Sequence, residues 1–500
     1  MSHLNMIQTL LSEVLNFFTL SITTLTTSNI ILLILVLLLT IICYTSYRKP
    51  FNAPPRFPIL LSILRRKYDF INKGPLELIQ DGYKSLGDIF RIQLFHQSVV
   101  FLIGPQAHKI FFESKDTQLS QREVYTFTIP VFGKNIVYDA SPKIMQQQLK
   151  FMNKGLNLMN MKAHVGKIVM EAEEWFDKWP QTGQIDLIKE FSELIILTAS
   201  RCLLGKEIRE NVHQEFAHLY QQLSDGMSHL SFFFPNAPTN AHKKRNLARI
   251  KISNIFENII KQRRINQNIE YDDFLQVLID ARYLDDSLPT DNEITGLLLA
   301  ALFAGQHTSN ITSTWMGLLL IKYKSEWMSK LLDEQKQIMY KYHGELSLDS
   351  LSEMNLLHAV MKETLRLYPP LVFLMRKVLE PISYNGYIIS KGDIAVVSPS
   401  VAHRISDVFK NPNEFNPERF LGENAEDQIE KFSFIAFGGG RHSCLGERFA
   451  YLQVKTIWSI LLRKFDFELC QEHPEPDYST LVVGPKAPCM VKFKRKIDSL

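Results

Sequence analysis

The sequence predicts a mainly α-helical protein with a small β-sheet portion and an N-terminal transmembrane anchor. Three observations predict this class: an uncharged apolar stretch near the amino terminus, apolar residues at helical spacing over most of the chain, and a few short alternating stretches. The 500 residues are 46% apolar and 22% charged, which is ordinary for a globular protein with a large core. The net charge of +4 indicates neither a nucleic-acid partner nor an acidic substrate.

Residues 1–49 are predicted to form the membrane anchor. Residues 14–47 carry no charge, and residues 30–43 are almost entirely Ile, Leu and Val, which meets the need of a bilayer for about 20 apolar residues. Arg48 and Lys49 follow directly and favour a cytosolic body. We therefore expect a single pass through the endoplasmic reticulum membrane and a folded domain over residues 50–500. A cleaved signal peptide is the alternative.

The folded domain begins after a proline-rich linker, because Pro50, Pro54, Pro55 and Pro58 indicate turns. Helical spacing of apolar residues is found at 145–179, 187–204, 247–264 and 450–465. Short alternating stretches that predict strands are found at 89–94, 99–103, 382–389 and 490–493.

The stretch 295–321 has no formal charge, so a second membrane span is one interpretation of it. Its centre, at residues 305–314, is rich in Gly, Gln, His, Thr, Ser and Asn. Such a polar cluster is costly in lipid unless it lines a cavity. The favoured interpretation is a long helix through the middle of a soluble domain, with a polar patch that faces a site.

The five cysteines show no CxxC pair and no regular spacing, which argues against a disulfide framework or a zinc site and fits a reducing compartment. Cys444 differs from the others because it lies in the run FGGGRHSCLG at 437–446, directly before an apolar helical stretch. The glycines let the backbone turn sharply near a flat ligand. A helix amino terminus stabilises a thiolate. A generic glycine loop with an incidental cysteine is the alternative; a phosphate loop is excluded because no Lys-Ser/Thr pair follows.

This run resembles the haem-binding loop of the cytochrome P-450 superfamily, whose signature spacing is occupied by Phe437, Gly440, His442 and Cys444. The resemblance implies the cytochrome P-450 fold, a haem b cofactor and Cys444 as the axial ligand of its iron. A thiolate ligand pushes electron density onto the iron and favours cleavage of a bound O–O bond.

Two charged residues upstream, Glu363 and Arg366, share a helix face at i and i+3 and can pair. Taken alone they also suit a solvated surface pair. With Arg419 they resemble the buried Glu–Arg–Arg triad of the same superfamily, which implies a structural role on the cysteine side of the haem.

Residues 304–308 resemble the oxygen groove of the superfamily, in which Ala304 and the following glycine leave room above the iron. Thr308 would then bind water or dioxygen and help to deliver protons. His307 stands where most members carry an acidic residue, and a histidine of near-neutral pKa can also relay a proton. That exchange is characteristic of the sterol 14α-demethylases. A buried polar kink in a core helix is the alternative.

The match to sterol 14α-demethylases extends over nearly all of residues 50–500, including 125–139, 369–377 and 478–483. It implies that the haem propionates are bound by Tyr125, Tyr138, Arg376 and His442. It also implies a sterol pocket lined by Phe127, Phe132, Ala304, Leu371, Phe373 and Val483, although core packing is the alternative for each aromatic. Phe127 implies a preference for a 4-monomethyl sterol such as obtusifoliol.

The implied reaction removes the 14α-methyl group of a sterol as formic acid in three O2-dependent steps. Electrons would come from NADPH through a separate NADPH–cytochrome P-450 reductase, since the chain has no flavin or nicotinamide fingerprint. Alternatives are hydroxylation of another lipid or of foreign compounds, an oxygen-independent rearrangement, and a non-enzymatic haem protein that binds sterol or gas. Five basic residues are predicted near the cysteine loop, either as a docking face for the reductase or as a solvated surface: Lys431, Arg448, Lys455, Arg463 and Lys464.

Overall fold

The computed structural model describes residues 52–58, 74–94, 97–266, 269–423 and 425–497. In the first half of the described chain the helices are α4 (Leu76–Leu86), α5 (Pro105–Glu113), α6 (Ile129–Phe132), α7 (Pro142–Gly155), α8 (Leu158–Asp177), α9 (Leu187–Ala199), α10 (Lys206–Asn211), α11 (His213–Asp225), α12 (His229–Phe233) and α13 (Asn240–Ile265). In the second half they are α14 (Phe274–Ile279), α15 (Asp291–Lys322), α16 (Lys324–Lys341), α17 (Leu348–Glu353), α18 (Asn355–Leu367), α19 (Pro399–Ala402) and α20 (Glu447–Lys464).

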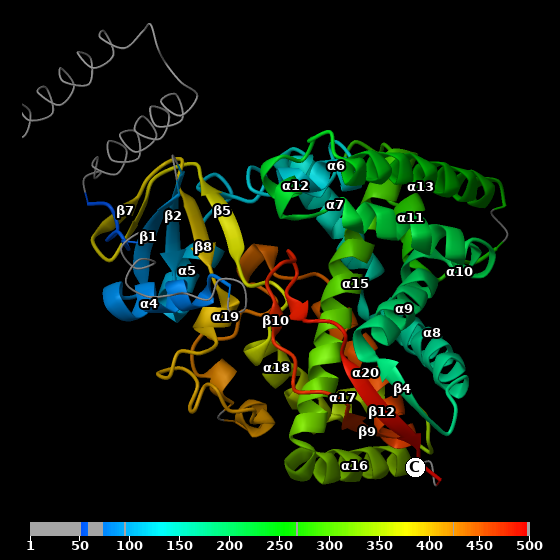
Figure 1. Cartoon of the computed structure of the whole chain (residues 1–500). Helices are drawn as coiled ribbons and strands as arrows, with labels where there is room; N and C mark the ends of the chain where they lie inside the picture. The colour runs from blue at the N-terminus through cyan, green and yellow to red at the C-terminus, as the bar shows by residue number, and fades with distance from the viewer. Residues whose placement is uncertain (1–51, 59–73, 95–96, 267–268, 424, 498–500) are drawn as a thin grey trace, which may run out of the picture.

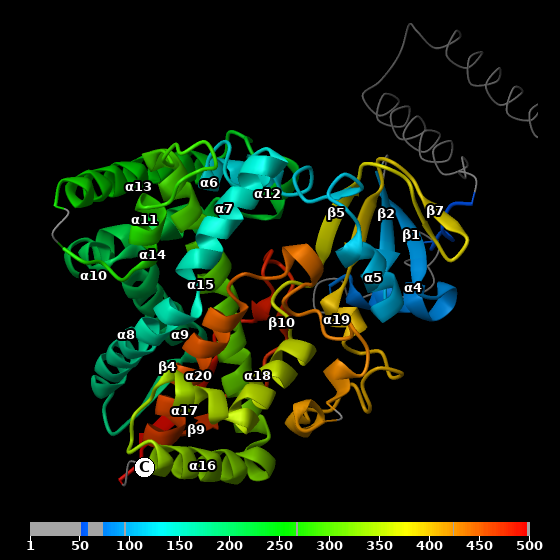
Figure 2. The ribbon, with the colours of Figure 1, turned by 180° about the vertical axis from the view of Figure 1, so that it is seen from behind.

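The strands form a small part of the molecule, as the sequence predicts. They are β1 (Ile89–Leu94), β2 (Gln97–Leu102), β3 (Leu119–Ser120), β4 (Thr182–Asp186), β5 (Leu374–Val378), β6 (Ile382–Tyr384), β7 (Tyr387–Ile389), β8 (Ile394–Val397), β9 (Phe465–Leu469), β10 (Pro476–Asp477), β11 (Gly484–Pro485) and β12 (Met490–Arg495). The larger sheet has the order β1-β2-β8-β5-β3, with only β2 and β8 parallel. The sheet, α4 and α5 lie on one side of the molecule, and α8 to α11 and α13 lie on the other (Figures 1 and 2).

The long helix α15 runs through the helical part of the molecule (Figure 1). It begins at a capping box in which the side chains of Thr290 and Glu293 each bond the other's backbone N–H. Its side chains are buried on nearly all faces, so the prediction of a long helix inside the folded domain is confirmed. Against α20 the approach is close, because a Cβ at Gly317 would lie 2.7 Å from the Trp458 ring.

Two predicted elements differ from the structure. The helical stretch 145–179 is broken into α7 and α8, because the Asn157 side chain accepts the Asn160 N–H at 3.0 Å and starts a new helix there. The stretch 382–389 is a hairpin rather than one strand. Asn385 and Gly386 have φ values of 48° and 78°, which match the two-residue turn that Asn-Gly favours.

No helix of the described residues is long and apolar enough to cross a membrane. The anchor predicted over residues 1–49 lies outside that part of the chain.

Candidate active site

One position in the loop before α20 requires glycine. Gly440 has a φ of 66°, and a Cβ there would lie 2.4 Å from the Phe112 carbonyl oxygen at the end of α5. Further along, the Cys444 N–H donates to the Phe437 carbonyl at 2.9 Å. These contacts fix the loop against α5 and set Cys444 three residues ahead of the first residue of α20.

The Cys444 thiol is surrounded by protein on most sides, yet its side chain is accessible. Burial raises the pKa of Cys444, and the N–H groups of Gly446 and Glu447 oppose that rise by bonding the sulfur. The thiol is therefore protonated at neutral pH in the protein alone. A metal cation at the sulfur reverses this balance, because a coordinating thiol is deprotonated outright.

The middle of α15 carries small residues beside open space. Ala304 is exposed although most of the helix is buried, and a Cβ built at Gly305 would have no described atom within 4 Å apart from its chain neighbours and the adjacent backbone of α15. The Thr308 hydroxyl donates to the Ala304 carbonyl at 2.6 Å. The groove thus has a hydroxyl beside open space, which is the arrangement that binding of a small molecule requires.

His307 does not have the near-neutral pKa that the sequence interpretation assumed. Burial lowers its pKa to about 4, so the imidazole is neutral at pH 7. Its ring lies beside Tyr220 and Phe303, and its Nε2 is 2.7 Å from the Ser224 hydroxyl on α11. A neutral imidazole has one donor and one acceptor nitrogen, so His307 can still pass a proton from one nitrogen to the other.

Three of the residues predicted to bind the haem propionates lie close together. The rings of Tyr125 and Tyr138 stack with centroids 4.8 Å apart, and burial raises both pKa values. Arg376 lowers the pKa of Tyr125, and the neighbouring Cys444 adds to the rise in the pKa of Tyr138. Sequence segments that are more than 200 residues apart therefore meet at the cysteine loop.

Arg376 is buried with only part of its hydrogen-bonding capacity used. Its side chain is 1% exposed, one terminal nitrogen donates to the Phe111 carbonyl, and Nε has no partner among the described residues. Burial lowers its pKa to about 10, so it stays cationic at neutral pH. A buried cationic donor without a partner fits a ligand carboxylate. Together with the accessible thiol, it fits a haem with propionate side chains.

His442 has a partner that the sequence did not predict. Its Nε2 lies 2.6 Å from Oδ1 of Asp116, a residue between α5 and β3. Asp116 belongs to no motif, and the two residues are 326 positions apart. The sequence gives no signal for this contact.

The predicted Glu–Arg–Arg triad is assembled and buried. Glu363 accepts from Arg366 Nε at 2.6 Å and Nη2 at 2.9 Å, and from Arg419 Nε at 3.1 Å. Glu363 and Arg366 are 0% exposed and Arg419 is 7% exposed, so the surface-pair alternative is wrong. A second carboxylate, that of Glu426, accepts from Arg419 at 2.6 Å and was not predicted.

Comparison with known proteins identifies the family. A sequence model described as cytochrome P450 matches residues 52–493. The chain belongs to the cytochrome P450 family. It is 44% identical to a sterol 14-demethylase of Arabidopsis thaliana, over 91% of this chain and 93% of that protein. It is 42% identical to an obtusifoliol 14-alpha demethylase of Triticum aestivum, over 90% of this chain and 99% of that protein.

The chain is also similar to an animal protein in sequence and to a cyanobacterial protein in fold. The chain is 39% identical to a lanosterol 14-alpha demethylase of Homo sapiens, over 85% of this chain and 83% of that protein. Among solved structures, the retinoic acid-bound cyanobacterial CYP120A1 has a TM-score of 0.77 and covers 90% of this chain and 100% of its own. At 23% identity that likeness shows the fold alone.

Of the six residues predicted to line the sterol pocket of this cytochrome P450, Ala304 is exposed on α15 and the other five have partners on several elements. Phe127 packs on Phe232 of α12, with centroids 5.3 Å apart, and Phe132 packs on Phe303 of α15. Leu371 and Val483 come together because the Val483 N–H donates to the Pro370 carbonyl at 2.8 Å. Leu371 is 40% exposed and Val483 is buried. The Phe373 ring packs on Phe101 of the larger sheet.

The basic docking face predicted for the reductase is wrong in part. Lys455 is 5% exposed, it donates to the Leu351 carbonyl, and burial lowers its pKa to about 8. Lys464 pairs with Asp177 at 2.9 Å. Arg448 is exposed. The reason for the error is that α20 is buried on several faces, so a basic residue on it need not reach solvent.

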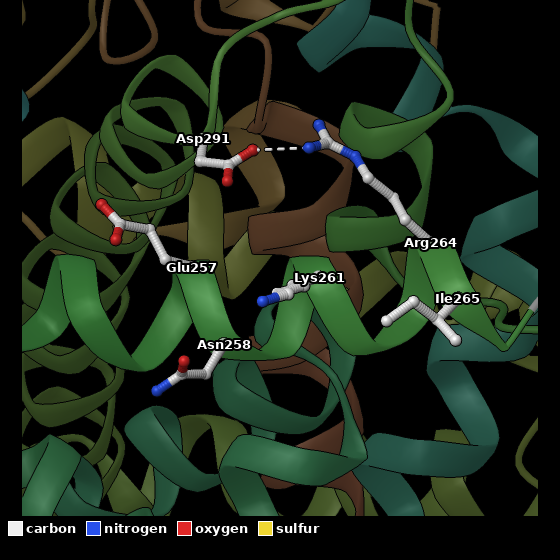
Figure 3. A pocket seen from close by; sticks show the side chains of 6 residues that line it. All are labelled: Glu257, Asn258, Lys261, Arg264, Ile265 and Asp291. Atoms are coloured by element: carbon white, nitrogen blue, oxygen red, sulfur yellow. Dashed lines mark hydrogen bonds and ion pairs between the residues drawn. The ribbon is translucent and has the colours of Figure 1, made fainter.

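A surface pocket of about 480 Å³ lies between the carboxyl end of α13 and the start of α15 (Figure 3). Arg264 and Asp291 form an ion pair at its edge, and Lys261 and Glu257 also line it. Neither the cysteine loop nor residues 304–308 contribute to it, so it is separate from the candidate active site.

Proposed function

We propose that this cytochrome P450 is a sterol 14α-demethylase: a haem-thiolate monooxygenase of sterol biosynthesis that releases the 14α-methyl group as formic acid in three O2- and NADPH-dependent steps. The structural observation that carries the proposal is the accessible Cys444 thiol in a loop that requires glycine at 440. The relatives support the substrate class, because they are named as 14-demethylases of sterols and match this chain over most of its length.

Haem, when bound, supplies the activation of dioxygen. Cys444 would hold the iron, and the N–H groups of Gly446 and Glu447 would stabilise the thiolate. Arg376 would hold a propionate through its unpartnered Nε. The Tyr125 and Tyr138 hydroxyls would add neutral donors there.

The residues of α15 handle protons near the reacting oxygen. The Thr308 hydroxyl donates to the Ala304 carbonyl, and it would leave that bond to hold water or dioxygen. His307 is neutral and bonds Ser224 through Nε2. A proton received at one ring nitrogen can leave from the other, so His307 connects the groove with α11.

Phe127 supports a preference for an obtusifoliol-like sterol over lanosterol, because its ring occupies space between η1 (Thr126–Thr128) and α12 that a smaller side chain would leave open. The test is turnover of obtusifoliol and of lanosterol, each alone, by wild type and by Phe127→Leu. We expect wild type to convert obtusifoliol faster and the variant to gain relative rate on lanosterol.

A matched control is Phe176→Leu, which makes the same change at a ring of α8 that packs on Trp179. It should lower stability and leave the ratio of the two rates unchanged. If wild type converts lanosterol faster, the assignment of Phe127 is wrong. If it converts neither sterol but hydroxylates another lipid, the alternative of a different haem-thiolate monooxygenase replaces the proposal.

We also propose that residues 1–49 anchor the chain in the endoplasmic reticulum membrane, with the catalytic domain in the cytosol. The uncharged run at 14–47 supports this. Leu230, Phe233 and Phe234, exposed by 47%, 71% and 63% at α12, are suited to rest on a lipid surface. The full chain should stay with membranes in alkaline carbonate, and a chain that starts at residue 50 should be released. Release of the full chain would contradict the anchor.

A further inference from the structure

A small cavity lies where the carboxyl-terminal half of α15, the end of α18 and the hairpin of β10 and β11 meet. Its volume is about 30 Å³, which is room for about two water molecules, since one water needs at least about 10–15 Å³. Asp, Glu and Lys are absent from the described residues that line it. The polar residues of the lining are Trp315, Tyr368, Ser400, Arg404 and Tyr478.

The cavity is close to the candidate active site. Val483, which is predicted to line the sterol pocket, also lines the cavity. The next residue, Gly484, packs on α15, because a Cβ there would lie 3.0 Å from the Ile311 side chain. Trp315 follows Thr308 by two turns, so the cavity and Thr308 are about 10 Å apart along one face of this helix.

The polar residues of the lining offer hydrogen-bond donors. The Arg404 guanidinium donates to the carbonyls of Ser400 and Leu367, and no carboxylate of the described residues forms an ion pair with it. The hydroxyls of Tyr368 and Tyr478 have no hydrogen-bond partner in the part of the chain that the structure describes. A guanidinium has five N–H donors and each phenol has one, so donors remain for a ligand that accepts.

The charges around the cavity favour an anion over a cation. Burial lowers the pKa of Arg404, yet a guanidinium remains charged at neutral pH. Burial also raises the pKa values of Tyr368 and Tyr478, and the charge of the exposed Glu475 adds to both rises. Glu475 does not line the cavity. It is a charge that opposes an anion from outside, so its removal tests the sign of the charge on the ligand.

We propose that this cavity binds formate, held by the Arg404 guanidinium and the Tyr478 hydroxyl. A carboxylate only accepts hydrogen bonds, and its pairing with a guanidinium is among the strongest that side chains make. Formate has three non-hydrogen atoms, which suits a cavity with room for about two waters. The inference rests on the proposed function for the source of the formate, because the 14α-methyl group leaves as formic acid. The site gives this product a polar place beside the apolar sterol pocket.

The test is the binding of carbon-13 formate to the full, haem-loaded chain, measured from the width of the formate NMR line. The reduced CO complex is used, so that CO and not formate occupies the iron. A ligand of three heavy atoms reaches a Kd of about 1 mM at best, and we expect a saturable broadening with a Kd of about 1–10 mM. Tyr478→Phe should weaken binding about tenfold, because it removes one hydrogen bond to a charged group. The absence of saturable broadening of wild type at about 100 mM formate would overturn the proposal.

The controls separate this cavity from other sites and an anion from a neutral ligand. Tyr387→Phe makes the same change on β7, outside the lining of the cavity, and should leave the Kd unchanged. Glu475→Gln should tighten formate binding and have no effect on the line of carbon-13 methanol. Equal losses in Tyr478→Phe and Tyr387→Phe would overturn the proposal, and so would methanol that binds as tightly as formate.

Failure of the formate site is distinguishable from failure of the proposed function. The thiolate-type band of the CO complex shows that each variant is folded around its haem, and the binding measurement involves no sterol. Formate binding that is lost in Tyr478→Phe supports the site whatever sterol the chain converts. Sterol demethylation by a wild-type chain that binds no formate would overturn the site and leave the proposed function in place.

Discussion

Replacing Glu363 by glutamine should destabilise the fold strongly, because it removes the only charge shared by two buried arginines. The carboxylate accepts two hydrogen bonds from Arg366, one from Arg419 and one from the Asn416 N–H at 2.8 Å. A glutamine side chain has one oxygen to accept them, and its NH2 group would face a guanidinium. The two arginines would then keep their charge in a site with too few acceptors.

The size of the loss follows from the partners that remain. Removing one member of a buried ion pair costs about 3–5 kcal/mol. Arg366 would keep the carbonyls of His403, Pro412 and Glu414. Arg419 would keep the carboxylate of Glu426. Because these contacts remain, we expect the free energy of unfolding to fall by about 3 kcal/mol, the lower end of that range. This is a large share of the roughly 5–15 kcal/mol by which a folded domain is stable.

The assay is urea unfolding of the haem-loaded protein, followed by far-ultraviolet circular dichroism and by the haem absorption band. The matched control is Glu418→Gln, which breaks the Lys330–Glu418 pair, whose side chains are 54% and 55% exposed. That variant should lose less than about 1 kcal/mol. If Glu363→Gln lost no more than the control, with a normal haem band, the reasoning that the triad stabilises the cysteine side would be refuted.

Three further predictions follow from the geometry. Gly440→Ala should abolish haem incorporation, because its Cβ would meet the Phe112 carbonyl at 2.4 Å and its φ of 66° disfavours alanine; the haem-to-protein absorbance ratio measures this. Burial lowers the pKa of His108 from 6.5 to about 4. The unfolded chain therefore takes up a proton that the folded one refuses, and unfolding measured from pH 6.5 to pH 4 should show a loss of up to about 3 kcal/mol from this residue. Lys455→Met should leave reductase binding unchanged, because the side chain is buried, whereas Arg448→Glu should weaken it in a titration with the reductase.

Each of these has an outcome that contradicts it. A normal haem content in Gly440→Ala would mean that α5 moves away from the loop. His108→Leu should show a smaller pH dependence than wild type, and an identical dependence would assign the acid lability to other groups. Weaker reductase binding by Lys455→Met would restore that residue to the docking face.

The parts of the site that can be predicted from the sequence are those whose residues lie only a few positions apart in the chain. The residues of the loop from Phe437 to Cys444, and those of the pair Glu363–Arg366, are close together in the sequence. Their chemistry can therefore be inferred before the fold is known. The length and burial of α15 were also predictable, because a long uncharged run with a polar centre has few stable alternatives.

The remaining features depend on contacts between distant segments. His442 meets Asp116 across 326 positions, and Lys455 is buried because α20 packs on several neighbours. The low pKa of His307 results from burial, and the identity of a residue does not show how deeply it is buried. The turn at Asn385-Gly386, in contrast, was predictable from the sequence. An Asn-Gly dipeptide is a recognised signal of a hairpin turn, and it lies inside the stretch that was predicted as one strand.

Product analysis tests the sterol 14α-demethylase assignment directly. The purified chain would be reconstituted with a cytochrome P450 reductase, NADPH and dioxygen, and offered obtusifoliol, with Cys444→Ser as the control. If the chain is a sterol 14α-demethylase, wild type forms formic acid and a 14-demethylated diene sterol in equal amounts, and the control forms neither. NADPH and dioxygen consumption with a normal thiolate-type CO spectrum, but no demethylated product from obtusifoliol or lanosterol, would keep the haem site and contradict the sterol 14α-demethylase assignment.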